Sequence, residues 1–524
     1  MKAMFGGLAL ALVLAAGAAT AGAAAAQDTP RDGGTITVAL NADIRSSDPG
    51  INRDGNTDTV MQHVVESLVG YREDLTVGPA LAESWTVTDD GRIYDFKIRK
   101  GALFHNGKPV TSAEVKWSWD RRWATDSWSC RPVFDGTAGL KVEAVETPDP
   151  QTIRFRLAQP NALFLAQLAN VQCFATGTIS PDSLNPDGSW NAPVATGPYK
   201  LASWKRGEAV VLQRFADYKP LSEPGSGYAG ARIAHADTIR FQIVPDPATA
   251  EAALATGGVD LLPSLAPGQI DQVKASGGTV ETAQGLGWSV ILVQTTDPLL
   301  SDVRIRQAIA HAIDLKQIAQ ARTYGLAEAN PSAVARSSTF FDDGFLGWPA
   351  YDPAKAQALL QEAGYKGQPI TIQTNKRYDG MYDNAVLVQA MLAAAGFDAR
   401  LEVLDWATQL DNYTAGKFQL QSFSFSARLD PSLLYGILIG SKAKTPSRQW
   451  DDPKAAELLA QSIRTEDAAK RKEALQQLHA LAAQQLPIIG LYYDPAVDAV
   501  GPKLKGYKPW AADKPRLWGA WKAE

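Results

Sequence analysis

The chain has 524 residues, of which 45% are hydrophobic and 20% are charged, and its formal net charge is −5. This length exceeds the roughly 250 to 300 residues at which single cores stop growing, so at least two lobes are expected. The acidic balance, with no Lys/Arg run flanked by aromatic residues, argues against nucleic acid or an anionic membrane surface as a partner.

The first 26 residues have the order of features of a secretory signal peptide. Lys2 is the only charge before Asp28, an apolar run follows at 8–16, and small residues continue to Ala26. The apolar run is shorter than the about 20 residues that span a bilayer, and no later apolar segment is longer. We predict a signal peptide over 1–26, a mature chain that begins near Gln27, and a periplasmic protein that is not membrane-embedded. Because no cysteine lies directly after the apolar run, no lipid anchor is expected. The alternative to a signal peptide is a disordered alanine-rich tail.

Strands and helices are predicted along the whole chain, more regularly in its second half. The first half carries predicted strands at 35–40, 93–98 and 152–157 and a helix at 112–122. The second half alternates helices with strands, at 302–321, 353–363, 370–374, 385–395, 399–404, 418–425, 468–485 and 488–492. This order predicts α/β lobes with a mostly parallel sheet. Since we find no long linker, the lobes should be joined by short hinges.

The two cysteines, Cys130 and Cys173, would lie in an oxidising compartment if the signal peptide is cleaved and the chain exported. We predict that they are disulfide-bonded, and two buried free thiols are the alternative.

The sequence carries none of the motifs that mark common catalytic or metal sites. Its five histidines are scattered, without H-E-x-x-H or zinc spacing, so no metal and no cofactor are expected. There is no G-x-S-x-G elbow, and the glycines at 197 and 285–287 are interpreted as turns. A secreted hydrolase with a carboxylate pair is the alternative, because such a pair is defined by its separation in space. Nothing positive in the sequence supports such a hydrolase, and we expect no enzyme.

Tryptophan and tyrosine are abundant, and several lie beside polar residues in predicted loops and strand ends: Trp128, Trp288, Tyr378, Tyr382, Trp406 and Tyr413. Such side chains combine a large apolar area with a polar group, which suits a cleft that holds an organic solute. Core packing is the alternative for most of them. Tyr378 and Trp406 are the exceptions, because each lies at a predicted strand end, where open α/β sheets bind ligands.

Seven sequence blocks resemble, in order, the signatures of one family: LVGYREDL (68–75), LAESW (81–85), KGALFHNG (100–107), VKWSW (115–119), TGPY (196–199), VRIRQA (303–308) and YDPAKA (351–356). This family is the dipeptide, oligopeptide and nickel class of bacterial extracytoplasmic solute-binding proteins. The resemblance implies an α/β fold with two lobes of the type II periplasmic binding protein kind, an extra subdomain in the first lobe, and a ligand held at the hinge. Its implied partners are a small-molecule solute and an inner-membrane ABC permease with its ATPase subunits, and a monomer is expected.

The resemblance also implies where the lobes begin and end. The expected segments are the first lobe at 27–70, 195–286 and 494–524, its extra subdomain at 71–194, and the second lobe at 287–493.

Ligand contacts in this family come from places that match segments of this chain. The loop after the first strand supplies Asn52, Arg53 and Asp54, a polar run with much hydrogen-bonding capacity, although a solvated turn is the alternative. The segment 374–378 matches the place where dipeptide-binding members carry an arginine for the ligand carboxylate, here Arg377 beside Tyr378.

The stretch 406–431 matches the third such place, with Trp406 and Phe425 as aromatic contacts. Trp288 is a further aromatic candidate. Counted from Trp406, peptide-binding members place an aspartate for the peptide's free amine where this chain has Arg428. A guanidinium there favours a carboxylate, phosphate or sugar-acid group over an ammonium. Two alternatives stay open: Arg428 forms a structural pair with Asp430, or the alignment slips by two residues and Asp430 itself takes the amine position.

Overall fold

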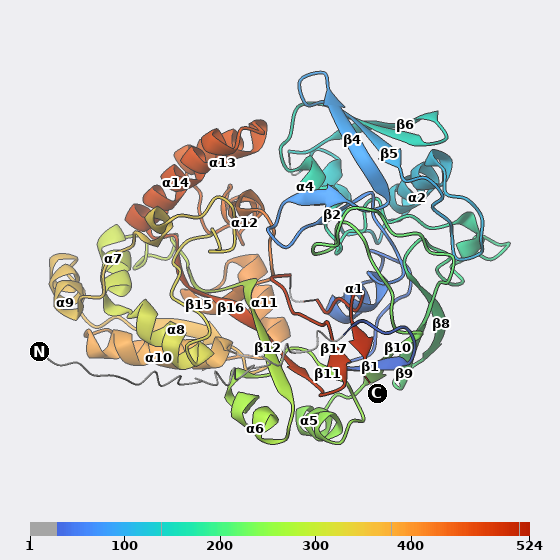
Figure 1. The fold of residues 1–524 in the computed structure, drawn as a ribbon. Helices are drawn as coiled ribbons and strands as arrows, with labels where there is room; N and C mark the ends of the chain where they lie inside the picture. Colours follow the sequence, from blue (N-terminus) through green and yellow to red (C-terminus); the bar gives the residue numbers. More distant parts are fainter. Residues whose placement is uncertain (1–28, 138, 379, 513, 524) are drawn as a thin grey trace, which may run out of the picture.

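The computed structural model describes residues 29–137, 139–378, 380–512 and 514–523 (Figure 1). The predicted signal peptide and the cleavage point near Gln27 lie outside these residues. Within the described part of the chain, no helix combines the length and apolarity needed to cross a bilayer.

The largest sheet has ten strands in the order β14-β13-β15-β12-β16-β11-β1-β10-β9-β8. Their bounds are β1 Thr35–Leu40, β8 Tyr199–Lys205, β9 Ala209–Arg214, β10 Thr238–Ile243, β11 Leu261–Leu262, β12 Thr279–Val293, β13 Ile370–Thr374, β14 Ala399–Val403, β15 Leu420–Phe425 and β16 Ile488–Val500. Parallel pairs lie at β10-β1-β11 and β14-β13-β15, and the other pairs are antiparallel. The prediction of a mostly parallel sheet was therefore wrong. The sheet is mixed because the hairpin β8-β9 and the long strands β12 and β16 add antiparallel pairs.

Strands β12 and β16 join the two halves of this sheet. The register between them shifts twice, between Ala283 and Gly287 and between Ser289 and Val290. Gly285 lies at the first of these shifts, where an added Cβ would overlap the backbone oxygen of Asp494. Figure 1 shows the two strands running through the centre of the molecule, between a helix-rich half and a strand-rich half. The two halves of the sheet are thus connected through strands whose pairing is irregular at the centre.

A four-stranded antiparallel sheet forms most of a separate layer at the upper right of Figure 1. It contains β4 Ala82–Thr88, β5 Ile93–Ile98, β7 Thr152–Leu157 and β6 Val142–Asp149, and its core includes Phe96, Phe155 and Trp119. The helices of this region are α2 Ser112–Ala124, α3 Arg131–Phe134 and α4 Phe164–Leu168, and a short ladder joins β2 Val69–Tyr71 to β3 Val77–Pro79. Cys130 and Cys173 form a disulfide here, which confirms the predicted bond.

The remaining described elements surround the ten-stranded sheet. They are the helices α1 Gly55–Met61, α5 Pro247–Ala255, α6 Ile270–Ala275, α7 Val303–Ala312, α8 Leu315–Thr323, α9 Pro353–Glu362, α10 Met381–Ala394, α11 Trp406–Ala415, α12 Pro431–Leu438, α13 Pro453–Arg464 and α14 Ala468–Gln485, the short 3-10 turns η1 Pro181–Ser183, η2 Pro267–Gln269 and η3 Asp343–Leu346, and the ladder of β17 Leu504–Lys505 with β18 Trp521–Lys522.

Most predicted elements are present, and one predicted helix is divided. The helix expected at 302–321 is two helices, because Ile313 is extended and Asp314 caps α8 by accepting from the backbone N–H of Gln317. Asp352 caps α9 in the same way through Lys355, as its Asp-Pro sequence predicted. Strand β16 is longer than the predicted 488–492, and its extra length reaches into the other half of the sheet.

Candidate functional site

A cleft of about 750 Å³ lies where β12 and β16 cross between the two halves of the molecule. It is lined by Arg53, Asp54, Gly55, Gln172, Gly285, Leu286, Gly287, Tyr378, Met381, Trp406, Tyr413, Phe423, Ser424, Phe425, Ser426, Ala427, Arg428, Ile437, Asp494, Pro495, Ala512 and Lys514. The walls thus come from both halves of the molecule, and the crossing strands form the floor. The volume falls within the range that encloses a small organic molecule.

An aromatic surface forms one wall of the cleft. The rings of Tyr378 and Trp406 meet edge to face with centroids 4.8 Å apart, and Trp406 lies 5.7 Å from Phe423. Tyr413 stacks on Phe423 at 4.8 Å, and Phe425 closes the row at 5.2 Å from Phe423. Trp406 is held at the first turn of α11, which Asp405 caps through the backbone N–H of Thr408. The packed rings leave a rigid apolar face toward the cleft.

The floor carries the carboxylate of Asp494. It accepts hydrogen bonds from the hydroxyl of Ser289 at 3.1 and 3.2 Å and from the hydroxyl of Ser424 at 3.2 Å. These three residues lie on the neighbouring strands β16, β12 and β15. The carboxylate therefore has a fixed position beside the irregular crossing.

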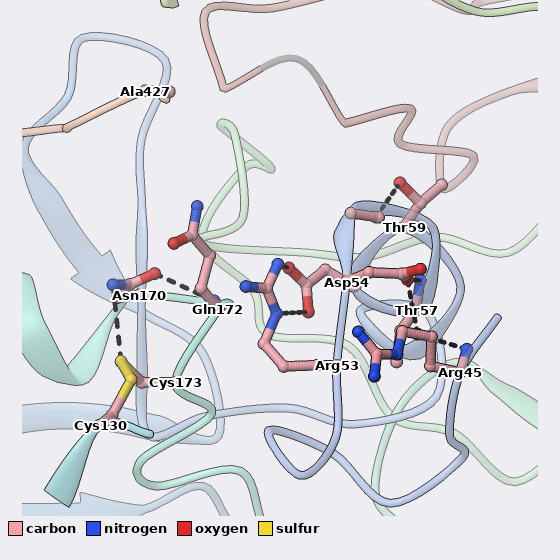
Figure 2. Close-up of polar contacts among 12 residues, drawn as sticks. Arg45, Arg53, Asp54, Thr57, Thr59, Cys130, Asn170, Gln172, Cys173 and Ala427 are labelled. Atoms are coloured by element: carbon pink, nitrogen blue, oxygen red, sulfur yellow. Dashed lines mark hydrogen bonds and ion pairs between the residues drawn. A yellow bond between two sulfur atoms is a disulfide. The ribbon is translucent and has the colours of Figure 1, made fainter. Parts of the chain in front are cut away.

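The loop that follows β1 supplies Arg53 and Asp54. Asp54 caps α1, since its Oδ1 accepts from both the backbone N–H and the hydroxyl of Thr57 at 2.8 Å. Arg53 pairs with Asp58 through its Nε, 2.8 Å from Oδ1, and through Nη2. Burial raises the pKa of Asp58 to about 6, and the charge of Arg53 opposes this rise. Figure 2 shows Arg53 with Gln172 beside the same space.

Neighbouring segments fix this loop firmly. Arg121 on α2 binds Asp48 with both terminal nitrogens, at 3.0 and 2.5 Å. Gly50 adopts φ +79°, and an added Cβ would lie only 2.5 Å from the backbone oxygen of Cys173. The loop therefore packs against the disulfide segment that also carries Gln172 into the cleft.

Arg428 lies between β15 and α12 and lines the same cleft as Arg53. Its Nη1 donates to the backbone oxygens of Ser426 at 3.2 Å and Ala427 at 3.1 Å. Burial lowers the pKa of this guanidinium; the hydroxyl of Tyr413 counters the effect, and the nearby charge of Arg53 adds to it. An arginine nevertheless stays protonated at neutral pH.

Asp430 does not pair with Arg428. It accepts two bonds from Nη2 of Arg471, at 2.8 and 2.7 Å, and caps α12 through the backbone N–H of Ser432. The pair with Arg471 is almost fully buried. A structural Arg428–Asp430 pair was one alternative from the sequence, and the geometry excludes it.

Six of the ten residues expected at the site from the sequence line the cleft: Arg53, Asp54, Tyr378, Trp406, Phe425 and Arg428. The other four, Asn52, Trp288, Arg377 and Asp430, lie outside this lining. Trp288 is 1% exposed, because β12 packs on both faces and this ring points into the core beside Tyr493. Asp430 is committed to Arg471. Asn52 and Arg377 are exposed at the surface, outside the lining, and Arg377 lies over the ring of its neighbour Tyr378.

Sequence reasoning missed other lining residues, among them Gln172, Ser424, Asp494 and Lys514. Gln172 comes from the disulfide segment and Lys514 from the C-terminal tail, so neither lies near a predicted strand end. Asp494 belongs to the part of β16 beyond the predicted strand. Among the described residues, no group of His, Cys, Asp and Glu side chains is arranged to hold a metal ion.

Comparison with known proteins identifies the relatives of this chain. The glutathione-binding protein GsiB of Escherichia coli (strain K12) is 27% identical over 511 residues, which cover 94% of this chain and 95% of GsiB. The periplasmic binding protein DppA of Helicobacter pylori, solved with the peptide STSA, is 25% identical, with a TM-score of 0.77 and coverage of 94% of this chain and 99% of DppA.

A third relative supports the fold alone. The binding protein AgaA from A. tumefaciens R10, solved with agropinic acid, is 23% identical, with a TM-score of 0.75 and coverage of 94% of this chain and 99% of AgaA. These likenesses establish a two-lobed α/β fold of the periplasmic binding protein kind. The family model described as "Bacterial extracellular solute-binding proteins, family 5 Middle" matches residues 76–446. Since this match spans most of the 524 residues, the protein belongs to the family 5 bacterial extracellular solute-binding proteins of ABC importers.

Proposed function

We propose that this protein is the periplasmic receptor of a peptide-type ABC importer, and that it captures one small polar organic solute in the cleft between its lobes. The observation that carries the proposal is the position of the cleft. Its walls come from both halves of the molecule, and its floor is the irregular crossing of β12 and β16. A solute there contacts both lobes at once, so it stabilises the closed arrangement over the open one. The permease and its ATPase subunits would then recognise the closed form.

We assign the lobes as the sequence suggested. The first lobe would comprise 27–70, 195–286 and 494–524, with the subdomain at 71–194, and the second lobe 287–493. The register shift between Ala283 and Gly287 and the close approach of Gly285 to Asp494 fall at these boundaries, which supports the assignment. Both strands would bend there during closure.

The residues of the cleft favour a solute with an organic face and a polar end. The aromatic wall of Trp406, Tyr378 and Phe425 suits an apolar or sugar-like face, and Arg428 suits an oxyanion. GsiB is named as a glutathione-binding protein, and DppA and AgaA were solved with a peptide and with agropinic acid. A peptide-like or an anionic, sugar-like solute is therefore the class we propose. No covalent chemistry is needed for capture and release, and we propose that the protein is not an enzyme.

Identification of the bound native solute is the decisive test of this proposal. The protein, exported to a periplasm and purified without refolding, should carry a single small molecule that mass spectrometry detects after denaturation. The same experiment gives the mature N-terminus, expected near Gln27, and the mass of a monomer. If no solute remains bound, and candidate peptides or glycosides are instead converted to products at a steady rate, the receptor role is wrong and a hydrolase with cleft carboxylates is favoured.

A further inference from the structure

Two guanidinium groups reach the same cleft from opposite lobes. Arg53 lies in the loop between β1 and α1, and Arg428 lies between β15 and α12. They are close enough that the charge of Arg53 lowers the pKa of Arg428. Like charges that approach when two lobes close oppose that closure, and a bound anion between them reverses the effect.

Arg53 and Arg428 have different hydrogen-bond partners within the protein. Asp58 holds Arg53 from the protein side through Nε and Nη2, which leaves Nη1 without a described partner. Arg428 donates through Nη1 to two backbone oxygens of its own loop, and among the described residues no carboxylate forms an ion pair with it. Its Nε and Nη2 edge therefore keeps its donors for a ligand, in the fork geometry that matches an oxyanion.

The carboxylates that line the cleft do not neutralise this pair. The Asp54 side chain caps α1 through Thr57, and Asp494 accepts from Ser289 and Ser424 on the floor. Lys514 adds a third cation to the same lining. The lining thus holds more cations than carboxylates, although the chain as a whole carries a net charge of −5.

We propose that Arg53 and Arg428 form an anion clamp between the lobes: a carboxylate or another oxyanion of the solute bridges the two guanidiniums, and their mutual repulsion keeps the empty cleft open. This inference rests on the proposed receptor function and narrows the solute class. A solute with only a free amine at this end gains nothing from the clamp and adds repulsion. Gln172, which lies in the wall beside Arg53, is placed to donate its amide to the same oxyanion (Figure 2).

Lobe closure without solute tests the clamp directly. Spin labels on E143C and E473C, two exposed positions on β6 and α14, report the distance between the subdomain and the second lobe. The probe is sodium sulfate, titrated at constant ionic strength with sodium chloride. Sulfate should raise the closed fraction of the wild-type protein. Arg428→Gln should close more readily without sulfate and should lose the sulfate response, whereas Arg428→Lys should keep part of it.

The matched control is Arg400→Gln, which removes an exposed arginine of β14 in the same lobe and should behave like the wild type. A wild-type protein that does not respond to sulfate, or an Arg428→Gln protein with the wild-type closed fraction and response, would overturn the clamp. Arg428→Gln removes the donor to the backbone oxygens of Ser426 and Ala427, which then bond to solvent. An unchanged melting temperature shows that the variant is folded.

The affinities of the wild type and of Arg428→Gln for the native solute distinguish a failure of the clamp from a failure of the receptor function. Wild type should bind it at least about tenfold more tightly than Arg428→Gln, the effect of one hydrogen bond between charged groups. Equal affinities, with closure retained in both proteins, would refute the clamp and leave the receptor function standing. A wild-type protein that binds no solute while it turns over a substrate would refute the receptor function itself.

Discussion

A side-chain hydrogen bond connects the subdomain to the second of the two lobes proposed above. The hydroxyl of Tyr94, on β5 of the subdomain, donates to Oε1 of Glu466 at 2.9 Å, in the turn between α13 and α14. Beside it, the backbone N–H of Ala162 donates to the backbone oxygen of Ile463 at 2.8 Å. These bonds connect segments that lie on opposite sides of the proposed hinge, so they form only when the lobes are together. Tyr94→Phe should therefore destabilise the closed form selectively.

The size of the effect follows from the environment of this bond. The Tyr94 ring is 1% exposed, and burial together with Glu466 raises the pKa of its hydroxyl. A hydrogen bond to a charged acceptor contributes about 1.5 to 3 kcal/mol. In the open form both groups bond to water, so we expect about 1.5 kcal/mol to be lost from closure. If the empty protein is mostly open, this loss weakens solute binding about tenfold.

Calorimetry with the native solute measures the effect. The phenylalanine keeps the ring contacts with Phe96 at 6.5 Å and Phe164 at 4.7 Å, so the melting temperature of the empty protein should change little. Tyr365→Phe is the control, because it removes a hydroxyl whose partners all lie within the proposed second lobe: it donates to the backbone oxygen of Gln368 at 2.6 Å and accepts from the backbone N–H of Asp398 at 3.0 Å. An affinity for Tyr94→Phe equal to that of the wild type, with a normal melting temperature, would refute the reasoning that this bond belongs to the closed form alone.

Three further changes test other parts of the structure. Removing the disulfide with Cys130→Ser and Cys173→Ser should lower the free energy of unfolding by about 4 kcal/mol in the chain-entropy account, for a separation of 43 residues; urea unfolding with unchanged stability would contradict it. Trp406→Ala should weaken solute binding by about 2 kcal/mol through loss of the aromatic wall, and calorimetry showing an unchanged Kd would place the solute elsewhere. Burial lowers the pKa of His479 to about 4, so protons favour the unfolded state as the pH falls below about 6.5. His479→Gln should remove about 2 kcal/mol of the stability loss between pH 7 and pH 5, and equal pH slopes for variant and wild type in urea unfolding would contradict this.

The sequence was enough to predict much of the local structure of this protein. Strands β1, β5, β7 and β13 and helix α14 occupy the predicted residues, because alternating or 3.6-residue apolar patterns and Asp caps act over short distances. The seven family blocks pointed to the two-lobed fold, since they carry the turns and packing positions that the family shares. The disulfide followed from two cysteines without a competitor.

Tertiary structure decided the composition of the cleft. Trp288 and Phe425 are directly paired on β12 and β15, so their rings lie on the same face of the sheet and in one buried cluster. Only Phe425 also borders the cleft, because other segments of the chain cover Trp288. Arg471, 41 residues from Asp430 along the chain, forms the ion pair with that aspartate. Asp430 is therefore not the ion-pair partner of Arg428. Gln172 and Lys514 reach the cleft from a disulfide segment and a C-terminal tail. Contacts between residues far apart in the sequence depend on how the whole chain packs. The local periodicity of the sequence carries no information about them.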